Sequence, residues 1–248
     1  MKAFHFKSLP STNDKAMELA QQSASELSEF SYVVAEEQTN GRGRNGNSWS
    51  SAPAVGLYMS MILRPTLPLE YIPQLTLVAG VAICEALQTL PQKGGAATIG
   101  LKWPNDILIN ERKVAGILCE ASLQGDSATI IVGIGINISA TREQLPSRVI
   151  YPATSLMLEG IEADPATLAE QVAEALKQRI QQFYKSREIA SDWKQYDLLN
   201  GTSIKVQTPD IGLVEGIASG ITPTGELLVL DPATNTCHTI TAGSIVRE

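Results

Sequence analysis

A loop that sets two arginines among three glycines is the part of this sequence best suited to chemistry. It reads Gly41-Arg42-Gly43-Arg44-Asn45-Gly46-Asn47-Ser48-Trp49 and follows a strand-like stretch at residues 32–37. Glycine allows positive φ and close backbone approach, so main-chain N–H groups can line a phosphate. The guanidinium groups add permanent charge and a planar array of donors. The loop therefore predicts an anion site, with a solvated hairpin of incidental charge as the alternative.

The first six residues of this loop also fit the G-x-G-x-x-G dinucleotide fingerprint. That motif requires a helix to begin at the loop and an acidic residue about 20 positions later. Here the loop instead continues through a polar stretch to Pro53, and residues 56–64 have the pattern of another strand. We therefore predict that the loop joins two strands, which argues against a dinucleotide-binding fold.

A second group of reactive side chains lies in Lys102-Trp103-Pro104-Asn105-Asp106, followed by Lys113. Pro104 fixes a turn that would hold Asn105 and Asp106 at the mouth of a strand. A carboxylate there could coordinate a metal, orient a ribose hydroxyl or accept a proton. Lys113 begins a strand that quickly becomes apolar, which favours a partly buried ammonium. The alternative is a surface lysine beside an ordinary Asn-Asp turn.

Two further features could serve a ligand. Ser11-Thr12-Asn13-Asp14 precedes residues 15–22, where the apolar side chains share one helical face, so these polar residues mark a helix N-terminus. Capping alone would also explain them. Gly133 and Gly135 interrupt a β-branched strand at residues 129–138, which indicates either a bulge or packing constraint or the close approach of a ligand.

The elements that must position these groups follow from periodicity and turn signals. Apolar spacing predicts helices at residues 69–90, after Asp164-Pro165 as far as 183, and at 189–199. Strands are expected at 98–103, 106–110, 112–121 and 129–138. After Asn200-Gly201 the pattern changes to short strands that suggest a small barrel, at 203–207, 213–219, 226–230, 236–241 and 244–246. We therefore predict two domains, residues 1–200 and 201–248.

Composition and charge limit the classes of protein to which this chain can belong. The chain has 248 residues, 44% of them hydrophobic and 18% charged, which is ordinary for a globular protein. Its net charge of −7 argues against a nucleic-acid partner. The longest apolar run, residues 75–84, is too short to span a bilayer, and the N-terminus lacks a signal core.

Cysteine and histidine usage adds to this. Cys84, Cys119 and Cys237 are far apart in apolar or strand-like settings, so we expect buried, reduced thiols and a cytoplasmic location. Two histidines without a C-x-x-C pair speak against a zinc site, and no residue is assigned to a metal.

In chain order, several segments together resemble biotin protein ligase. They are Ser11-Thr12-Asn13, Glu37-Gln38-Thr39, the arginine-glycine loop with Trp49, Lys102 to Asp106, Lys113-Val114-Ala115-Gly116-Ile117-Leu118 with Glu120, and Gly133-Ile134-Gly135-Ile136-Asn137. The resemblance covers essentially the whole chain. Only ten residues precede Ser11, so it is to the short class without an N-terminal DNA-binding domain.

The resemblance implies a fold and a reaction. The fold would be α+β, a mixed and mostly antiparallel sheet with packed helices like the class II synthetase/biotin ligase core, plus a C-terminal SH3-like β-barrel. The enzyme would join biotin to ATP, with Mg²⁺, as biotinyl-5′-AMP and transfer biotin to one lysine of a biotin carboxyl carrier protein. A lipoate-protein ligase and a non-enzymatic biotin-sensing regulator are the alternatives. Oligomeric state stays open, with a homodimer among the options.

The resemblance also implies roles for single residues. Lys113, Arg44 and Asp106 would be catalytic, the cations offsetting negative charge and Asp106 accepting a proton from the carrier lysine. Trp49 would supply an apolar lid. Asn47 departs from the arginine that many members have there. The biotin site would comprise Ser11, Thr12, Asn13, Gln38, Arg42, Gly43, Arg44 and Lys113, and the nucleotide side would comprise Trp49, Asn105, Asp106 and Asn137.

Overall fold

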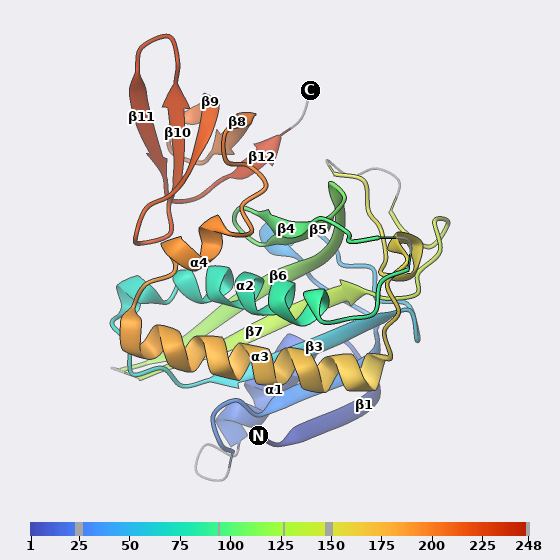
Figure 1. Cartoon of the computed structure of the whole chain (residues 1–248). Helices are drawn as coiled ribbons and strands as arrows, with labels where there is room; N and C mark the ends of the chain where they lie inside the picture. Colours follow the sequence, from blue (N-terminus) through green and yellow to red (C-terminus); the bar gives the residue numbers. More distant parts are fainter. Residues whose placement is uncertain (23–26, 94, 126, 147–150, 247–248) are drawn as a thin grey trace.

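The computed structural model describes residues 1–22, 27–93, 95–125, 127–146 and 151–246 (Figure 1). Within these ranges a seven-stranded sheet has the order β1-β2-β3-β7-β6-β5-β4. Only β1 and β2 pair in parallel and the other neighbours are antiparallel, which confirms the expected mixed, mostly antiparallel sheet. Its strands are β1 (Ala3–Leu9), β2 (Tyr32–Gln38), β3 (Gly56–Leu63), β4 (Ile99–Lys102), β5 (Asp106–Ile109), β6 (Arg112–Gln124) and β7 (Ser127–Asn137).

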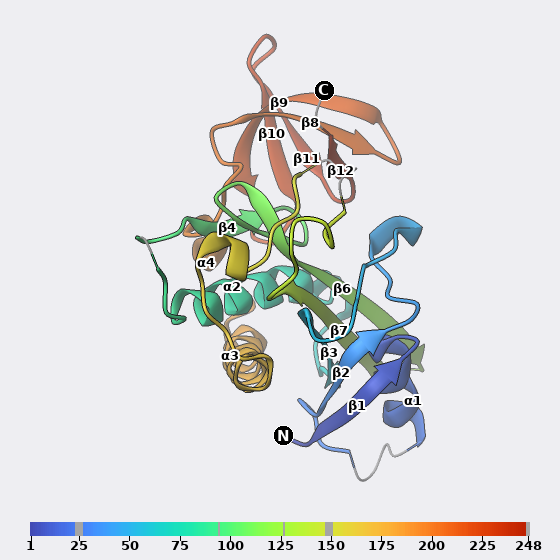
Figure 2. The same ribbon diagram turned by 90° about the vertical axis from the view of Figure 1, so that its right-hand side faces the viewer.

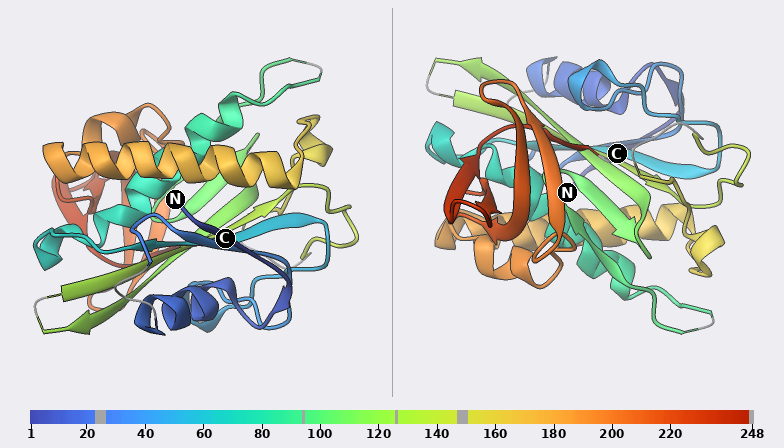
Figure 3. Two further views of the ribbon diagram at one scale, coloured as in Figure 1. Left: turned by 90° about the horizontal axis from the view of Figure 1, so that it is seen from below. Right: turned by 90° about the horizontal axis from the view of Figure 1, so that it is seen from above.

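Helices cover both faces of this sheet. Seen from below in Figure 3, α1 (Thr12–Gln22) lies on one side, and α2 (Gln74–Gln88) and α3 (Pro165–Ser186) lie on the other. Strand β3 shows why both faces are needed, because all eight of its residues are buried. Met59 and Met61 pack in the core beneath α2 and α3, whereas Ile62 packs with α1. Because successive side chains of a strand point to opposite faces of the sheet, β3 contributes to an apolar layer on each face.

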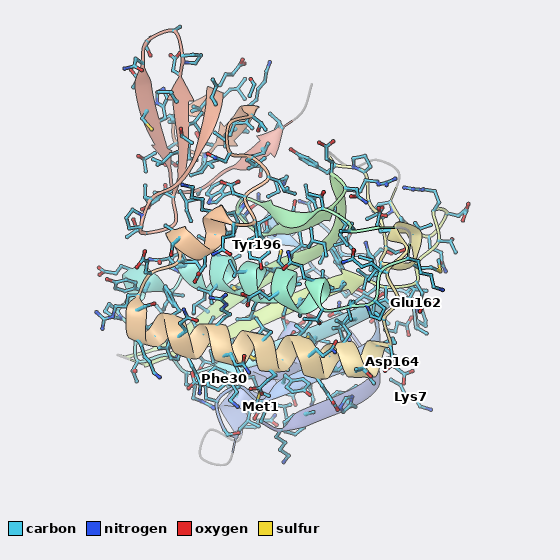
Figure 4. All side chains as sticks on the ribbon, viewed as in Figure 1. Met1, Lys7, Phe30, Glu162, Asp164 and Tyr196 are labelled. Carbon is cyan, nitrogen blue, oxygen red and sulfur yellow. The ribbon has the colours of Figure 1, made fainter. Side chains whose placement is uncertain are left out.

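The α3 helix is as the sequence predicts. The Asp164 carboxylate accepts a hydrogen bond from the Thr167 N–H at 2.9 Å, and Pro165 occupies the first turn, where its missing N–H is not needed (Figure 4). The helix then buries an apolar stripe against α2 and the sheet, formed by Leu168, Val172, Leu176, Ile180 and Phe183.

Two predicted helices are shorter than expected. The helix expected from residue 69 begins at Gln74 after a separate turn, η2 (Leu69–Tyr71), with Pro73 at its N-cap. The helix expected over 189–199 is α4 (Ala190–Lys194). Beyond α4 the backbone pairs with β4 instead, because the Leu101 N–H donates to the Tyr196 carbonyl at 2.7 Å and the Leu198 N–H donates to the Leu101 carbonyl at 3.0 Å.

Among the described residues, the stretch Leu69–Gln88 is long and apolar enough to cross a membrane by length and composition. However, 61% of its apolar 18-residue window is buried inside the protein. The helix is therefore accounted for as the core helix that packs on the sheet and on α3.

The C-terminal residues form a second sheet with the order β11-β10-β9-β8-β12, placed beside α4 and β4 (Figure 2). The two edge strands, β11 and β12, are not paired with each other within the described chain, so closure into a barrel and the domain boundary after residue 200 stay predictions. The strands are β8 (Ser203–Thr208), β9 (Gly212–Ile221), β10 (Leu227–Asp231), β11 (Thr236–Ile240) and β12 (Ser244–Val246).

All three cysteines are free, but they are not all buried. Cys84 is buried in α2 and Cys119 is half-buried. The expectation of a buried thiol is wrong for Cys237, which is exposed because it lies on the edge strand β11 of the small sheet.

Candidate functional site

A cleft of about 530 Å³ opens where the N-terminus of α1, the arginine-glycine loop, the starts of β5 and β6, and β7 converge. Such a volume suits a small-molecule ligand. Residues far apart in the sequence meet here, and all twelve site residues expected from the sequence line the cleft. They are Ser11, Thr12, Asn13, Gln38, Arg42, Gly43, Arg44, Trp49, Asn105, Asp106, Lys113 and Asn137.

One half of the cleft, which we call the neutral half, consists of hydroxyl and amide groups. The Thr12 N–H donates to Gln38 Oε1 at 2.8 Å, and Gln38 Nε2 donates to Ser51 Oγ at 2.9 Å. The Ser60 hydroxyl lies 2.7 Å from Thr12 Oγ1 and 2.6 Å from Asn13 Oδ1. The Ser60 hydroxyl has one proton and donates it to one of these two oxygens at a time, and Thr12 Oγ1 in turn donates to Gln38 Oε1 at 3.0 Å.

Gly133 is required by the packing of this half rather than by a bulge. The β6–β7 ladder runs through it without a break, with Leu118 opposite Gly133. A Cβ atom on Gly133 would lie only 2.2 Å from Asn13 Oδ1. Asn13 cannot easily move, because its Nδ2 donates to the Leu118 carbonyl at 3.2 Å and to Glu120 Oε2 at 2.6 Å. The neutral half is therefore rigid.

Arg42 is tied to two carboxylates. It donates to both oxygens of Asp14, at 2.8 and 2.7 Å, and to Glu120 at 3.2 Å. The hydrogen bond to Asp14 raises the pKa of Arg42, and the same contact lowers the pKa of Asp14. The Arg42 charge is thus offset before any ligand arrives. Arg42 fastens the loop to α1 and β6, and Arg44 and Lys113 are better placed to meet an anion.

The arginine-glycine loop forms a tight hairpin between β2 and β3. This confirms the prediction that the loop joins two strands. The Gly43 N–H donates to the Asn47 carbonyl at 2.7 Å, and the Trp49 N–H donates to the Gly41 carbonyl at 2.9 Å. Gly46 has φ of +75°, a conformation that favours glycine. Asn47 Nδ2 donates to the Arg44 carbonyl at 2.9 Å, so the residue that departs from the family pattern stabilises this turn.

Trp49 lies across the glycines of the sheet. A Cβ atom on Gly135 would lie 2.4 Å from Trp49 Cε2, and one on Gly116 would lie 3.1 Å from Cζ3. Lys113 Nζ is 5.3 Å from the centre of the indole ring, within the range of a cation–π contact. The buried indole Nε1 has no hydrogen-bond partner among the described residues.

The other half, which we call the ionic half, centres on Asp106. Its carboxylate lies 2.7 Å from Lys102 Nζ and 2.6 Å from Lys113 Nζ. Burial opposes ionisation of Asp106, but the two ammonium groups outweigh it and hold its pKa below 3.8. Lys113 is partly buried, with 28% of its side chain exposed, as the sequence indicates. Asp106 is therefore an ionised, weakly basic group at neutral pH.

Two asparagines frame the ionic half. Asn105 Nδ2 donates to the Ile117 carbonyl at 2.9 Å, and its Oδ1 accepts from Arg44 Nη1 at 3.2 Å. Burial lowers the pKa of Arg44, although a guanidinium stays charged. Asn137 Nδ2 donates to the Thr154 carbonyl at 2.9 Å. Beside it lies an apolar patch that could receive a flat ring, formed by Val55, Ala140, Leu145 and Ala153.

Sequence reasoning did not assign several residues of the site. The sequence does mark Ser60 as unusual, since it is the one serine in the apolar run 56–63 and a buried hydroxyl needs a hydrogen-bond partner. Lys102 lies within the Lys-Trp-Pro-Asn-Asp motif, but its sequence context alone does not distinguish a role for it. The pairing of Asp14 and Glu120 with Arg42 had no signal, because these residues are 28 and 78 positions from Arg42.

Comparisons with known proteins agree with this geometry. Residues 5–137 match the biotin/lipoate A/B protein ligase family. The bifunctional ligase/repressor BirA of Bacillus spizizenii is 37% identical over 225 residues, covering 89% of this chain and 67% of the relative. The biotin–[acetyl-CoA-carboxylase] ligase of Paracoccus denitrificans is 34% identical, covering 90% and 92%. Biotin protein ligase from Aquifex aeolicus, solved in complex with biotin and ATP, superposes with a TM-score of 0.80 at 29% identity, covering 100% of this chain and 99% of that one.

Proposed function

Since this chain belongs to the biotin/lipoate A/B protein ligase family, we propose that it activates biotin with ATP as biotinyl-5′-AMP. It then transfers the biotinyl group to a lysine of a biotin carboxyl carrier protein. The observation that carries this proposal is one cleft in which a neutral half adjoins an ionic half. The whole chain also aligns with a ligase whose structure holds both biotin and ATP.

The neutral half suits the uncharged end of biotin. A ureido group offers one carbonyl acceptor and two N–H donors, and it needs partners of both kinds when it is buried. Ser11, Thr12, Asn13 and Gln38 line this half and supply hydroxyl and amide groups, which include both donors and acceptors. The charges nearest to this half, those of Arg42, Asp14 and Glu120, are paired with one another, which favours a neutral ring.

The ionic half suits the first chemical step. A biotin carboxylate oxygen attacks the α-phosphorus of ATP, the bond to the bridging oxygen breaks, and pyrophosphate leaves. Two like unit charges at about 4 Å repel by roughly 1 kcal/mol in bulk water and by more in a protein. Arg44 borders the cleft without a described ion-pair partner, and Lys102 and Lys113 share the single carboxylate of Asp106, so net positive charge remains there to offset that repulsion. The charge of Arg42, in contrast, is already offset by Asp14 and Glu120.

The second step requires a neutral carrier lysine. Its amine attacks the carbonyl carbon of the anhydride, AMP leaves with the bonding electrons, and the amine releases a proton. An unperturbed lysine has a pKa of about 10.4, so its neutral form lies roughly 4 to 5 kcal/mol uphill at pH 7. Asp106, with a pKa lowered by two lysines, is a weak base. Its geometry supports positioning Lys113 more than it supports the proton-accepting role expected from the sequence.

The described residues of the cleft offer no carboxylate cage for a resident Mg²⁺. Both oxygens of Asp106 are engaged by lysines, and no cluster of three metal-ligating side chains occurs in the described ranges. Mg²⁺ binds readily through phosphate and water oxygens. We therefore assign it to the substrate, as the Mg²⁺ complex of ATP.

A direct assay tests the proposal. The protein is mixed with ATP, Mg²⁺, biotin and an apo carboxyl-carrier domain, and mass spectrometry should find one biotin added to a single lysine. In parallel, biotin should support exchange of pyrophosphate into ATP, whereas lipoate should not. Equal exchange with lipoate would favour a lipoate-protein ligase. No exchange with either acid would overturn the proposal.

A further inference from the structure

A buried carboxylate outside the cleft, that of Glu159, joins the two segments that build the ionic half. From this arrangement we infer that Glu159 is a positioning residue for ATP, an inference that rests on the proposed function. Glu159 ends a short 3₁₀ turn, η3 (Met157–Glu159), and its side chain is only 2% exposed. It does not line the cleft, so any effect on the reaction passes through the residues that it holds.

The donors to Glu159 come from two separate segments. From its own segment, the Thr154 hydroxyl donates to Oε1 at 2.5 Å. From the turn after β5, Asn110 Nδ2 donates to Oε2 at 2.8 Å. From the first residue of β6, Arg112 Nη2 donates to Oε2 at 3.2 Å, and Arg112 Nε lies 3.0 Å from Oε1. A buried carboxylate is stable only when its oxygens are paired, so these contacts hold the two segments together.

The segments that Glu159 joins contain Lys113 and the wall of the nucleotide side. Lys113 pairs with Ala153 in a short parallel bridge. The Lys113 N–H donates to the Pro152 carbonyl at 2.8 Å, and the Thr154 N–H donates to the Lys113 carbonyl at 2.8 Å. Two backbone hydrogen bonds make a short bridge, and Glu159 adds a side-chain anchor at each end of it.

A shift of this bridge would move Lys113 and the wall of the nucleotide side but not the hydrogen-bonded groups of the neutral half. Ala153 belongs to the apolar patch, and the Thr154 carbonyl holds the Asn137 amide. The hydrogen bonds of the neutral half involve Thr12, Gln38 and Ser60, and they share no member with the Glu159 cluster. Loss of the Glu159 contacts should therefore weaken ATP binding selectively.

The main test is Glu159→Gln. Glutamine keeps the shape of the side chain but replaces one acceptor oxygen with an NH₂ group that faces donors, and it removes the charge that pairs with Arg112. We expect the Kd and KM for ATP to rise about tenfold, which corresponds to the loss of one charged hydrogen bond. The Kd for biotin should stay within about twofold, because that half of the cleft shares no contact with Glu159. Calorimetry gives both Kd values, and biotin-dependent pyrophosphate exchange gives KM.

A second variant and a matched control accompany this test. Thr154→Val removes one donor without changing shape, and it should raise the Kd for ATP about threefold through the loss of one neutral hydrogen bond. Glu162→Gln is the matched control, since Glu162 lies three residues further on and pairs with Lys93 in a contact whose side chains are 63% and 73% exposed (Figure 4). It should leave both Kd values unchanged, because exposed pairs contribute little.

The outcomes separate the two proposals. If Glu159→Gln and Thr154→Val lower the melting temperature but leave the Kd for ATP unchanged, Glu159 only stabilises the fold and the inference is wrong. Equal weakening of ATP and biotin would also overturn it. If the wild-type protein binds ATP but shows no biotin-dependent exchange, the proposed function fails, while the comparison of ATP affinities still decides the role of Glu159. A wild type that does not bind ATP would overturn both.

Discussion

The neutral half and the ionic half of the cleft are built on different physical principles. The neutral half rests on α1 and on regular strands, where hydroxyl and amide groups interlock at hydrogen-bond distance. The ionic half is placed by turns and a short bridge, and two lysines share one carboxylate. Neutral hydrogen bonds depend steeply on geometry, whereas charges act over longer distances and respond to pH and burial. Selective recognition thus suits the first half, and charge compensation suits the second.

This comparison makes the two halves separable by mutation. Changes of packing in the neutral half should alter biotin affinity with little dependence on pH. Changes of charge in the ionic half should alter nucleotide chemistry and acid stability. A variant that weakened both ligands equally would show that the halves are coupled, and the four variants below are ordered by the size of the expected effect.

Gly133→Ala should have the largest effect. Its Cβ would lie 2.2 Å from Asn13 Oδ1, and Asn13 is held by Leu118 and Glu120. We expect biotin affinity to fall about 100-fold, because overpacking of this order displaces a fixed polar group. Titration calorimetry should show ATP affinity within about twofold of wild type, since distant sites are nearly independent. A comparable loss of ATP affinity would contradict the separation.

Arg44→Gly comes next. Its guanidinium borders the cleft, donates to Asn105 and has no described carboxylate within ion-pair distance. Without it, biotinyl-5′-AMP should dissociate about 30-fold faster, as expected for the loss of one charged hydrogen bond. A filter assay of the retained adenylate measures the rate. Arg187→Gly is the control, because Arg187 is exposed and has φ of +55°, which glycine accepts, so it should leave retention unchanged.

Lys102→Met should have a smaller effect that depends on pH. The folded pKa of Asp106 lies below its unfolded value, so its ion pairs stabilise the protein above that unfolded value and are lost as pH falls through the folded pKa. Removing Lys102 raises the folded pKa and should move acid unfolding, followed by circular dichroism, to higher pH. We also expect the KM for ATP to rise about tenfold. Lys93→Met is the control, because its ion pair is exposed, and an identical acid shift there would contradict the role of Lys102.

Ser60→Ala should have the smallest effect. It removes the hydroxyl that joins Thr12 to Asn13 but leaves Gln38 in contact with Thr12. We expect biotin to bind about fivefold more weakly, as for one neutral hydrogen bond, with the same ratio to wild type at pH 6 and pH 8. A ratio that changed between these pH values would mean that the neutral half contains a titrating group.

Much of the fold could be predicted because its signals are local. The apolar stripe and Asp164 cap of α3, and the strands on either side of the arginine-glycine loop, depend on the spacing of near neighbours in the chain. The end of α4 could not be predicted, because the backbone there pairs with Leu101, about a hundred positions earlier. The exposure of Cys237 depends on which strand of the small sheet forms its edge, and that is a property of the assembled sheet.

For the site, residue types and spacing picked out two arginines, a Lys-Trp-Pro-Asn-Asp segment and a polar helix start as candidate ligand-binding groups. All twelve residues assigned to the site line one cleft, whereas Trp103 of that segment is buried in the core. Only the tertiary structure decided how their charges are shared. Asp14 and Glu120 offset Arg42, while Lys102 and Lys113 together hold Asp106 ionised. The physical reason is that a charge acquires its chemical character from the groups within a few ångströms of it, and the chain must fold before those neighbours exist.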